Sequence, residues 1–72
     1  MYDYSMLLGR MREKGTTQEE LAKQINRNPA TLTQKLKGRT YFTQREMAAI
    51  CQTLDIRMEE MPNYFFTHKL RK

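Results

Sequence analysis

The segment Thr17-Gln18-Glu19-Glu20-Leu21-Ala22 carries the pattern that decides the fold of this chain. Thr17 followed three residues later by Glu20 is a capping-box pattern, which starts a helix because each side chain satisfies a free backbone N–H group at the helix start. The inner face of this short helix is formed by Leu21, Ala22 and Ile25. A second short helical pattern follows directly and closes at Gly38. Two abutting helices at this spacing predict a helix-turn-helix over about residues 17–38.

The turn between the two helices falls at Asn26-Arg27. Asn tolerates a positive φ angle better than any other residue except Gly, so it suits this turn. Asn28 is expected to cap the next helix and Pro29 to occupy its first position, where a missing N–H group costs nothing. Leu32 and Leu36 lie one turn apart and form its buried side.

Three further helices are expected outside this motif. One runs from about Tyr4 to Lys14, with Asp3 as its N-cap, Gly15 as a left-handed end and Gly9 allowing close helix packing. A second capping box, Thr43 with Glu46, is expected to start another helix. Its apolar side consists of Met47, Ile50, Cys51 and Leu54. A short fifth helix is expected near Met58 to Met61, with Pro62 interrupting any longer run. The chain is therefore predicted to be all-α, a single compact five-helix domain over residues 1–72.

Composition excludes several classes of function. The chain has 72 residues, and neither a signal peptide nor an apolar run of membrane length is present, so we expect a cytoplasmic protein of a bacterial host cell with no membrane contact. Cys51 is the single cysteine and is expected to be a small core hydrophobe. His68 is the single histidine and has no carboxylate or nucleophile at informative spacing. We predict no enzyme, no catalytic residue, no metal site and no cofactor.

Positive charge is concentrated in one part of the sequence. The formal net charge is +5, and between Leu21 and Arg45 there are basic residues but no acidic ones. This block consists of Lys23, Arg27, Lys35, Lys37, Arg39 and Arg45. A second basic stretch lies in the tail, about residues 67–72. A cationic block that coincides with a helix-turn-helix favours a polyanionic partner, here the major groove of double-stranded DNA.

The second helix of the motif offers one side to that groove. With Leu32 and Leu36 pointing inward, steps of about 100° per residue place Ala30, Gln34 and Lys37 outward, flanked by Thr31 and Thr33. Gln34 suits an adenine edge, and Ala30 and Thr31 suit a thymine methyl group. Phosphate contacts are expected from Gln18, Asn28, Lys35, Lys37 and Arg39.

One helix-turn-helix contacts a single half-site, so operator binding ordinarily requires a homodimer with half-sites about 34 Å apart. The sequence does not mark the dimer surface clearly. Tyr41-Phe42 and Tyr64-Phe65-Phe66 are candidates. Aromatic residues after the last helix more often close the core of a small domain, which is the interpretation we favour for Phe65.

Residues 17–38 resemble the helix-turn-helix of the Cro and lambda-repressor-like family. The resemblance is carried by Gln18, Leu21-Ala22, a turn residue that accepts a positive φ, and Gly38. Three positions depart from the family pattern: Asn26 replaces the usual Gly, Arg27 replaces an apolar residue, and Leu36 comes one place late. The resemblance implies a lambda-repressor-like DNA-binding domain.

The whole chain is also similar to small single-domain regulators of temperate phages of Gram-positive bacteria, especially in Tyr2-Asp3-Tyr4-Ser5 and Tyr64-Phe65-Phe66. This resemblance implies a component of a lysis–lysogeny switch. Two functions follow from it: a Cro-like repressor that occupies operator DNA, which the acid-free block favours, or an antirepressor of the modulator-of-repression type that forms a heteromeric complex with the cognate phage repressor. An antitoxin role is a third alternative. Relative affinity for an operator fragment and for the repressor would discriminate between the first two.

Overall fold

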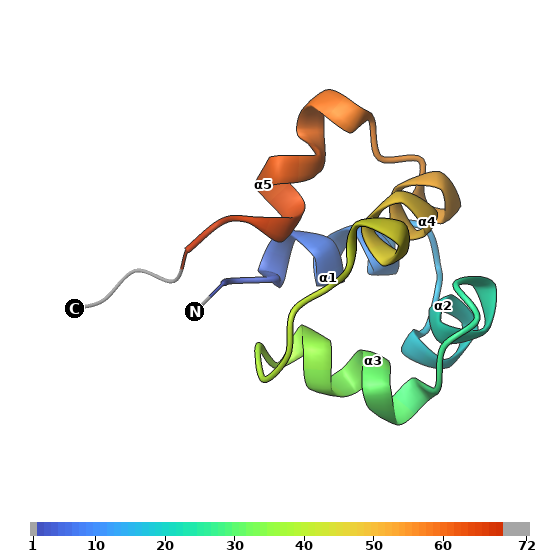
Figure 1. Ribbon diagram of the computed structural model, residues 1–72. Coiled ribbons are helices and arrows are strands. Elements are labelled where there is room, and N and C mark those ends of the chain that lie inside the picture. Colours follow the sequence, from blue (N-terminus) through green and yellow to red (C-terminus); the bar gives the residue numbers. More distant parts are fainter. Residues whose placement is uncertain (1, 69–72) are drawn as a thin grey trace.

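The computed structural model describes residues 2–68 of the chain, and within that range it contains five α-helices and one 3-10 turn (Figure 1). The helices are α1 (Ser5–Glu13), α2 (Gln18–Gln24), α3 (Pro29–Leu36), α4 (Gln44–Leu54) and α5 (Met61–Phe65), with the 3-10 turn η1 at Met58–Glu60. The only β-type pairing of the described residues is an isolated bridge between Tyr2 and His68. The predicted all-α fold is confirmed. Residues 69–72 of the predicted basic tail lie outside the described residues.

Left-handed residues end each of the first three helices. Gly15, Asn26 and Gly38 have φ angles of 64°, 59° and 81°. In each case the next residue's N–H group donates back to a carbonyl inside the helix, as Arg27 does to Ala22 at 2.8 Å. This double closure satisfies carbonyl groups that a helix end otherwise leaves unpaired. The turn predicted at Asn26 is thus confirmed.

The expected helix starts are also present. Both capping boxes form, Thr17 with Glu20 and Thr43 with Glu46. Asn28 caps α3 by accepting a hydrogen bond from the Ala30 N–H group at 2.8 Å. Asp3 differs from the prediction by one position. The N-cap residue of α1 is Tyr4, and Asp3 Oδ1 accepts instead from the backbone N–H and the hydroxyl of Ser5, at 2.9 and 2.6 Å.

The last helical segment is longer than predicted. Pro62 does not interrupt it but lies in the first turn of α5, which extends to Phe65. The physical reason is that the ring of proline fits the first turn of a helix, where the N–H group that it lacks has no intrahelical partner. The 3-10 turn at Met58–Glu60 therefore leads into α5.

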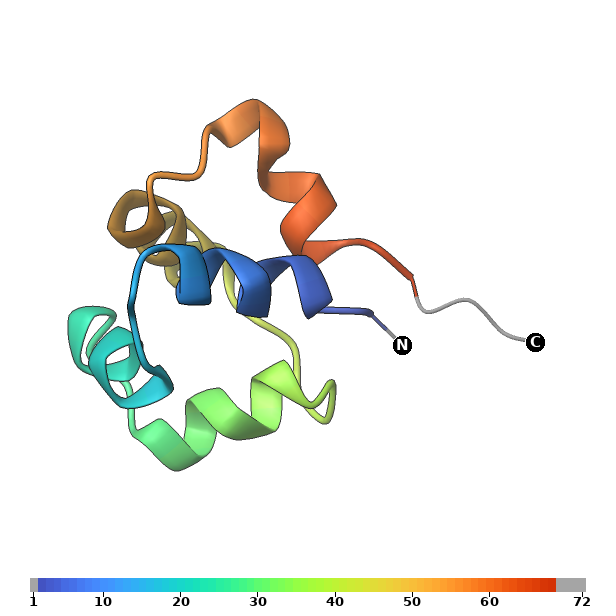
Figure 2. The ribbon, with the colours of Figure 1, turned by 180° about the vertical axis from the view of Figure 1, so that it is seen from behind.

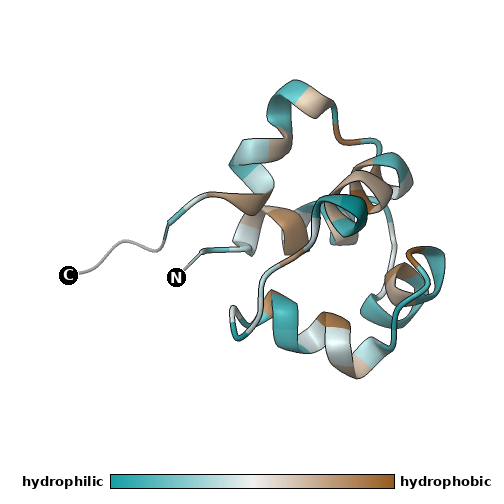
Figure 3. Cartoon of the chain, viewed as in Figure 1, coloured by the Kyte–Doolittle hydropathy of each residue, from teal (hydrophilic) through white to brown (hydrophobic). Residues whose placement is uncertain are grey.

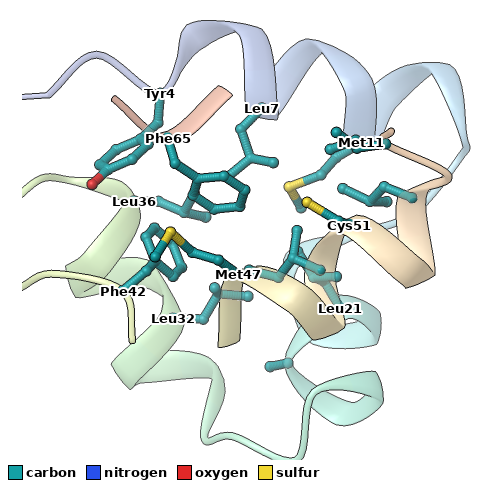
Figure 4. Packing of buried hydrophobic residues seen from close by; sticks show 14 residues of the cluster. Tyr4, Leu7, Met11, Leu21, Leu32, Leu36, Phe42, Met47, Cys51 and Phe65 are labelled. Atoms are coloured by element: carbon teal, nitrogen blue, oxygen red, sulfur yellow. The ribbon is translucent and has the colours of Figure 1, made fainter. Parts of the chain in front are cut away.

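One core joins the helices. Helix α2 packs on α3 and α4, while α1 packs on α5, and Figure 2 shows from behind how α1 crosses between the other elements. Figure 4 shows the rings of Tyr4, Phe42 and Phe65 gathered at one end of the core, with centroids of neighbouring rings 5.3 and 5.4 Å apart. Leu32 and Leu36 are buried as predicted, and Cys51 is a buried core residue with a free thiol.

Two contacts fix the ends of this core. The Asp3 N–H group donates to the Thr67 carbonyl oxygen at 2.6 Å, so the first and last described segments are joined. Arg10 on α1 donates to the carbonyl oxygens of Leu54 and Asp55 at 2.9 and 3.0 Å. These carbonyls belong to the end of α4, where a cation is favourable. The segment before α1 is therefore joined to the segment after α5, and α1 itself is joined to the end of α4.

Gly9 does not have the packing role expected from the sequence. A Cβ atom built at this position meets only the Arg12 Nη2 atom, at 4.0 Å, so no neighbouring helix approaches it closely. Gly9→Ala should therefore raise the free energy of unfolding by about 0.5–1 kcal/mol, because Gly in a helix interior is unfavourable relative to Ala. Urea denaturation of both proteins measures this difference.

Gly15→Ala is the matched control. It makes the same chemical change in open space but at a φ of +64°, so it should lower the free energy of unfolding by about 1 kcal/mol. If Gly9→Ala destabilised the protein as Gly15→Ala does, the helix at Gly9 would not be open as described.

Candidate binding surface around helix α3

Helix α3 lies against α2 and presents its opposite side to solvent (Figure 1). Because both Leu32 and Leu36 are buried, the rotation of α3 is the one expected from the sequence. Ala30, Thr31 and Lys37 are exposed, while Thr33, Gln34 and Lys35 are half-buried. The predicted contact residues on α3 are therefore only in part on the open surface.

Several of the predicted contact residues bind each other. The Thr33 hydroxyl donates to Gln18 Oε1 at 2.9 Å, which links the start of α2 to the middle of α3. The Arg39 guanidinium donates to Gln34 Oε1 at 3.0 Å. Bidentate recognition of adenine requires the whole amide of a glutamine. In this arrangement the oxygen of Gln34 is already engaged.

Glu46 forms the strongest polar feature next to this surface. Its side chain is only 2% exposed. Oε1 accepts hydrogen bonds from Lys35 Nζ and from the Thr43 N–H group, both at 2.7 Å, and Oε2 accepts from Arg27 Nε at 2.7 Å. Figure 3 shows in teal the turn between α2 and α3 and the first turn of α4, the two hydrophilic segments that carry Arg27 and Glu46. We call these four residues, Arg27, Lys35, Thr43 and Glu46, the Glu46 cluster.

The environment of Glu46 favours its charged form. Burial alone raises the pKa of a carboxyl group, but hydrogen bonds from Lys35, from the Thr43 backbone and from Arg27 outweigh burial and lower the pKa of Glu46 to about 2. Glu46 is therefore an anion throughout the neutral range. Lys35 is also held by the Tyr41 carbonyl oxygen at 3.1 Å, and its ammonium lies 5.9 Å from the centroid of the Phe42 ring.

This cluster changes the interpretation of Lys35. The sequence predicts it as a phosphate contact, but its side chain is only 12% exposed and is paired with Glu46. Lys37 and Arg39 are exposed and remain suited to an anionic partner. Sequence reasoning assigned Glu46 only to a capping box and gave Arg27 no partner. The available signal was that Glu46 lies four residues before Ile50, on the apolar side of α4, where an unpaired charge is costly.

The predicted dimer candidates divide between core and surface. Phe42 and Phe65 are buried, whereas Tyr41 is 73% and Phe66 42% exposed. The ring of Tyr2 lies between the two exposed ones, with centroids 6.0 Å from Tyr41 and 5.6 Å from Phe66. The expectation that Phe65 closes the core is confirmed. Within the described part of the chain, no helix is long and apolar enough to cross a membrane.

Comparison with known proteins identifies a family and a similar solved structure. A family model described as "Protein of unknown function (DUF739)" matches residues 1–68. Among solved structures, the chain is similar to the solution structure of the modulator of repression (MOR) of the temperate bacteriophage TP901-1 from Lactococcus lactis. The two share 31% sequence identity with a TM-score of 0.77, and the match covers 97% of this chain and 95% of the other. No curated protein matches the chain.

The Glu46 cluster generates a stability prediction. The pKa of Glu46 is near 2 in the folded chain and about 4.5 without these partners, so its stabilising effect is complete above pH 4.5 and is lost as pH falls toward 2. Glu46→Gln should lower the free energy of unfolding at pH 7 by about 3 kcal/mol, and the deficit relative to the parent should shrink as pH falls through this range. Urea denaturation across pH measures both effects.

Glu20→Gln is the matched control, because Glu20 occupies the same capping-box position in α2 but is exposed. Its hydrogen bonds with Thr17 lower the pKa of Glu20, and among the described residues no cation forms an ion pair with it. The loss of stability should therefore be much smaller. Equal losses for both variants would mean that the capping contacts, and not the two cations, account for the role of Glu46.

Proposed function

The chain belongs to the DUF739 family, and from this membership and the structural match we propose that it is an antirepressor, a protein that binds a phage repressor and weakens the repressor's hold on operator DNA. The similarity to a modulator of repression is the observation that carries the proposal. It extends over nearly the full length of both chains, so the relative's role is proposed for this chain as a whole. We place the complex in the cytoplasm of a bacterial host.

The surface around α3 supports a protein ligand more than DNA. Two members of the cationic block, Arg27 and Lys35, share one carboxylate, and Gln34 is bonded to Arg39. DNA affinity depends mainly on cations that are free to replace counterions at phosphates. The positive charge counted from the sequence therefore overstates the charge that α3 offers to a duplex.

Operator binding through α3 is the second candidate. It is favoured by the exposed Lys37 and Arg39 and by the two small exposed residues at the start of α3, Ala30 and Thr31. In this candidate the chain is a Cro-like, lambda-repressor-like regulator, and the contact set is the one predicted from the sequence without Lys35. Operator binding would also require a homodimer.

The test is a competition experiment with the repressor encoded beside this chain and its labelled operator duplex. An antirepressor should release the operator from the repressor as its concentration rises, which fluorescence anisotropy detects, and should elute with the repressor as one complex in size-exclusion chromatography. A repressor from an unrelated phage is the control and should keep its operator.

The opposite pattern would support the second candidate. If the chain forms no complex with the repressor but binds the operator more tightly than an unselected duplex, the antirepressor proposal is wrong. Selection from a random DNA pool then identifies the operator, because a dimeric binder enriches a palindrome.

A further inference from the structure

We propose that Glu46 is a specificity-determining residue that disfavours binding of nucleic acid to the α2–α3 surface. It does so by forming ion pairs with cations that this surface would otherwise present to phosphates. The inference rests on the proposed function in one respect only: a protein, and not DNA, is taken as the ligand. The role of Glu46 concerns the exclusion of nucleic acid from this surface and does not depend on which protein binds there.

The two cations that Glu46 binds both belong to the segment predicted as a helix-turn-helix. Arg27 belongs to the turn between α2 and α3, and Lys35 belongs to α3 itself. The Arg27 side chain is 44% exposed, so it is bound to Glu46 while still reaching solvent. Loss of the carboxylate would leave this guanidinium at the surface without its ion-pair partner.

Neutralised cations contribute little to DNA binding. Affinity for an unselected duplex comes from replacement of counterions at phosphates, and each phosphate contact steepens the dependence of log K on log salt by about 0.9. A buried carboxylate shared between two cations removes about one positive charge from the surface and repels an approaching phosphate. Specificity of this kind depends on a repulsive element as well as on attractive contacts.

Helix capping alone does not explain the charge of Glu46. The capping box requires an acceptor at this position, and glutamine serves as well as glutamate. The box of α2 forms with Glu20 exposed, whereas the same position in α4 is buried between two cations. Well-packed apolar residues in place of the whole ion-pair network could stabilise this region as well as the charges do. A role in disfavouring phosphate binding accounts for both the burial of the Glu46 carboxylate and its two cationic partners.

The closing experiment compares Glu46→Gln with Glu20→Gln in binding to a random duplex at increasing salt. Each variant raises the formal net charge by one unit at the third position of a capping box, but only Glu46→Gln releases held cations. We expect the salt slope of Glu46→Gln to steepen by about 0.9 to 1.8 and its affinity at low salt to rise several-fold. Glu20→Gln should change much less. Equal slopes for the two variants would overturn the inference.

A second comparison does not require Glu46→Gln to fold. In the parent protein, Arg27→Gln removes a cation that is already held, and Lys37→Gln removes an exposed one. We expect Lys37→Gln to flatten the salt slope by about 0.9 and Arg27→Gln to flatten it clearly less, because the Arg27 guanidinium is already bound to Glu46. If both variants flatten it equally, Arg27 is not withheld from phosphate and the inference is wrong.

Failure of this inference is distinguishable from failure of the proposed function. If the parent chain binds its repressor but Glu46→Gln behaves like Glu20→Gln, only the role of Glu46 is wrong. If the parent chain selects an operator and ignores the repressor, the proposed function itself is wrong.

Discussion

One buried carboxylate orients the α2–α3 region against α4, and the surface around α3 depends on it. Glu46 lies in the first turn of α4 and accepts hydrogen bonds from the α2–α3 turn, from α3 and from its own helix start. Apolar contacts alone fix how far apart helices lie, but they are not directional. Charge-assisted hydrogen bonds are directional, so they also fix the rotation of α3 relative to α4. The orientation of the surface around α3 follows from this constraint.

The same contact sets what that surface can recognise. The fold uses part of its positive charge internally, in the ion pairs of Arg27 and Lys35 with Glu46. What α3 then offers is small exposed side chains with two remaining cations at its end, Lys37 and Arg39. Such a surface is compatible with a folded protein partner, where shape and apolar contact matter more than counterion release. The fold of this chain therefore does not by itself identify its ligand, because function depends on the residues of the site.

Local signals in the sequence predicted most of the helices and their ends. The features that were not predicted depend mainly on contacts between residues far apart in the sequence. Thr17 with Glu20, Asn26 and Pro29 each act within one helical turn, so their roles followed from residue type and spacing. The ion pairs of Glu46 join residues 11 and 19 positions apart. No periodicity reveals such a pairing, and Lys35 was consequently assigned to phosphate. Pro62 was misjudged for a different reason: proline both ends helices and begins them, and only tertiary packing decides which.

The hydrogen bond between the Asp3 N–H group and the Thr67 carbonyl oxygen, which we call the clasp, affects the order in which parts of the molecule unfold. It joins positions separated by nearly the whole described chain, so forming it closes a long loop and costs much more chain entropy than a local contact. The Glu46 cluster closes only short loops within residues 27–46. We therefore expect the clasp to form late in folding and to break first in the native state, while α2, α3 and α4 stay together. Tyr2 would separate together with this hydrogen bond, so its ring contacts the exposed rings of Tyr41 and Phe66 only while the first and last described segments are paired.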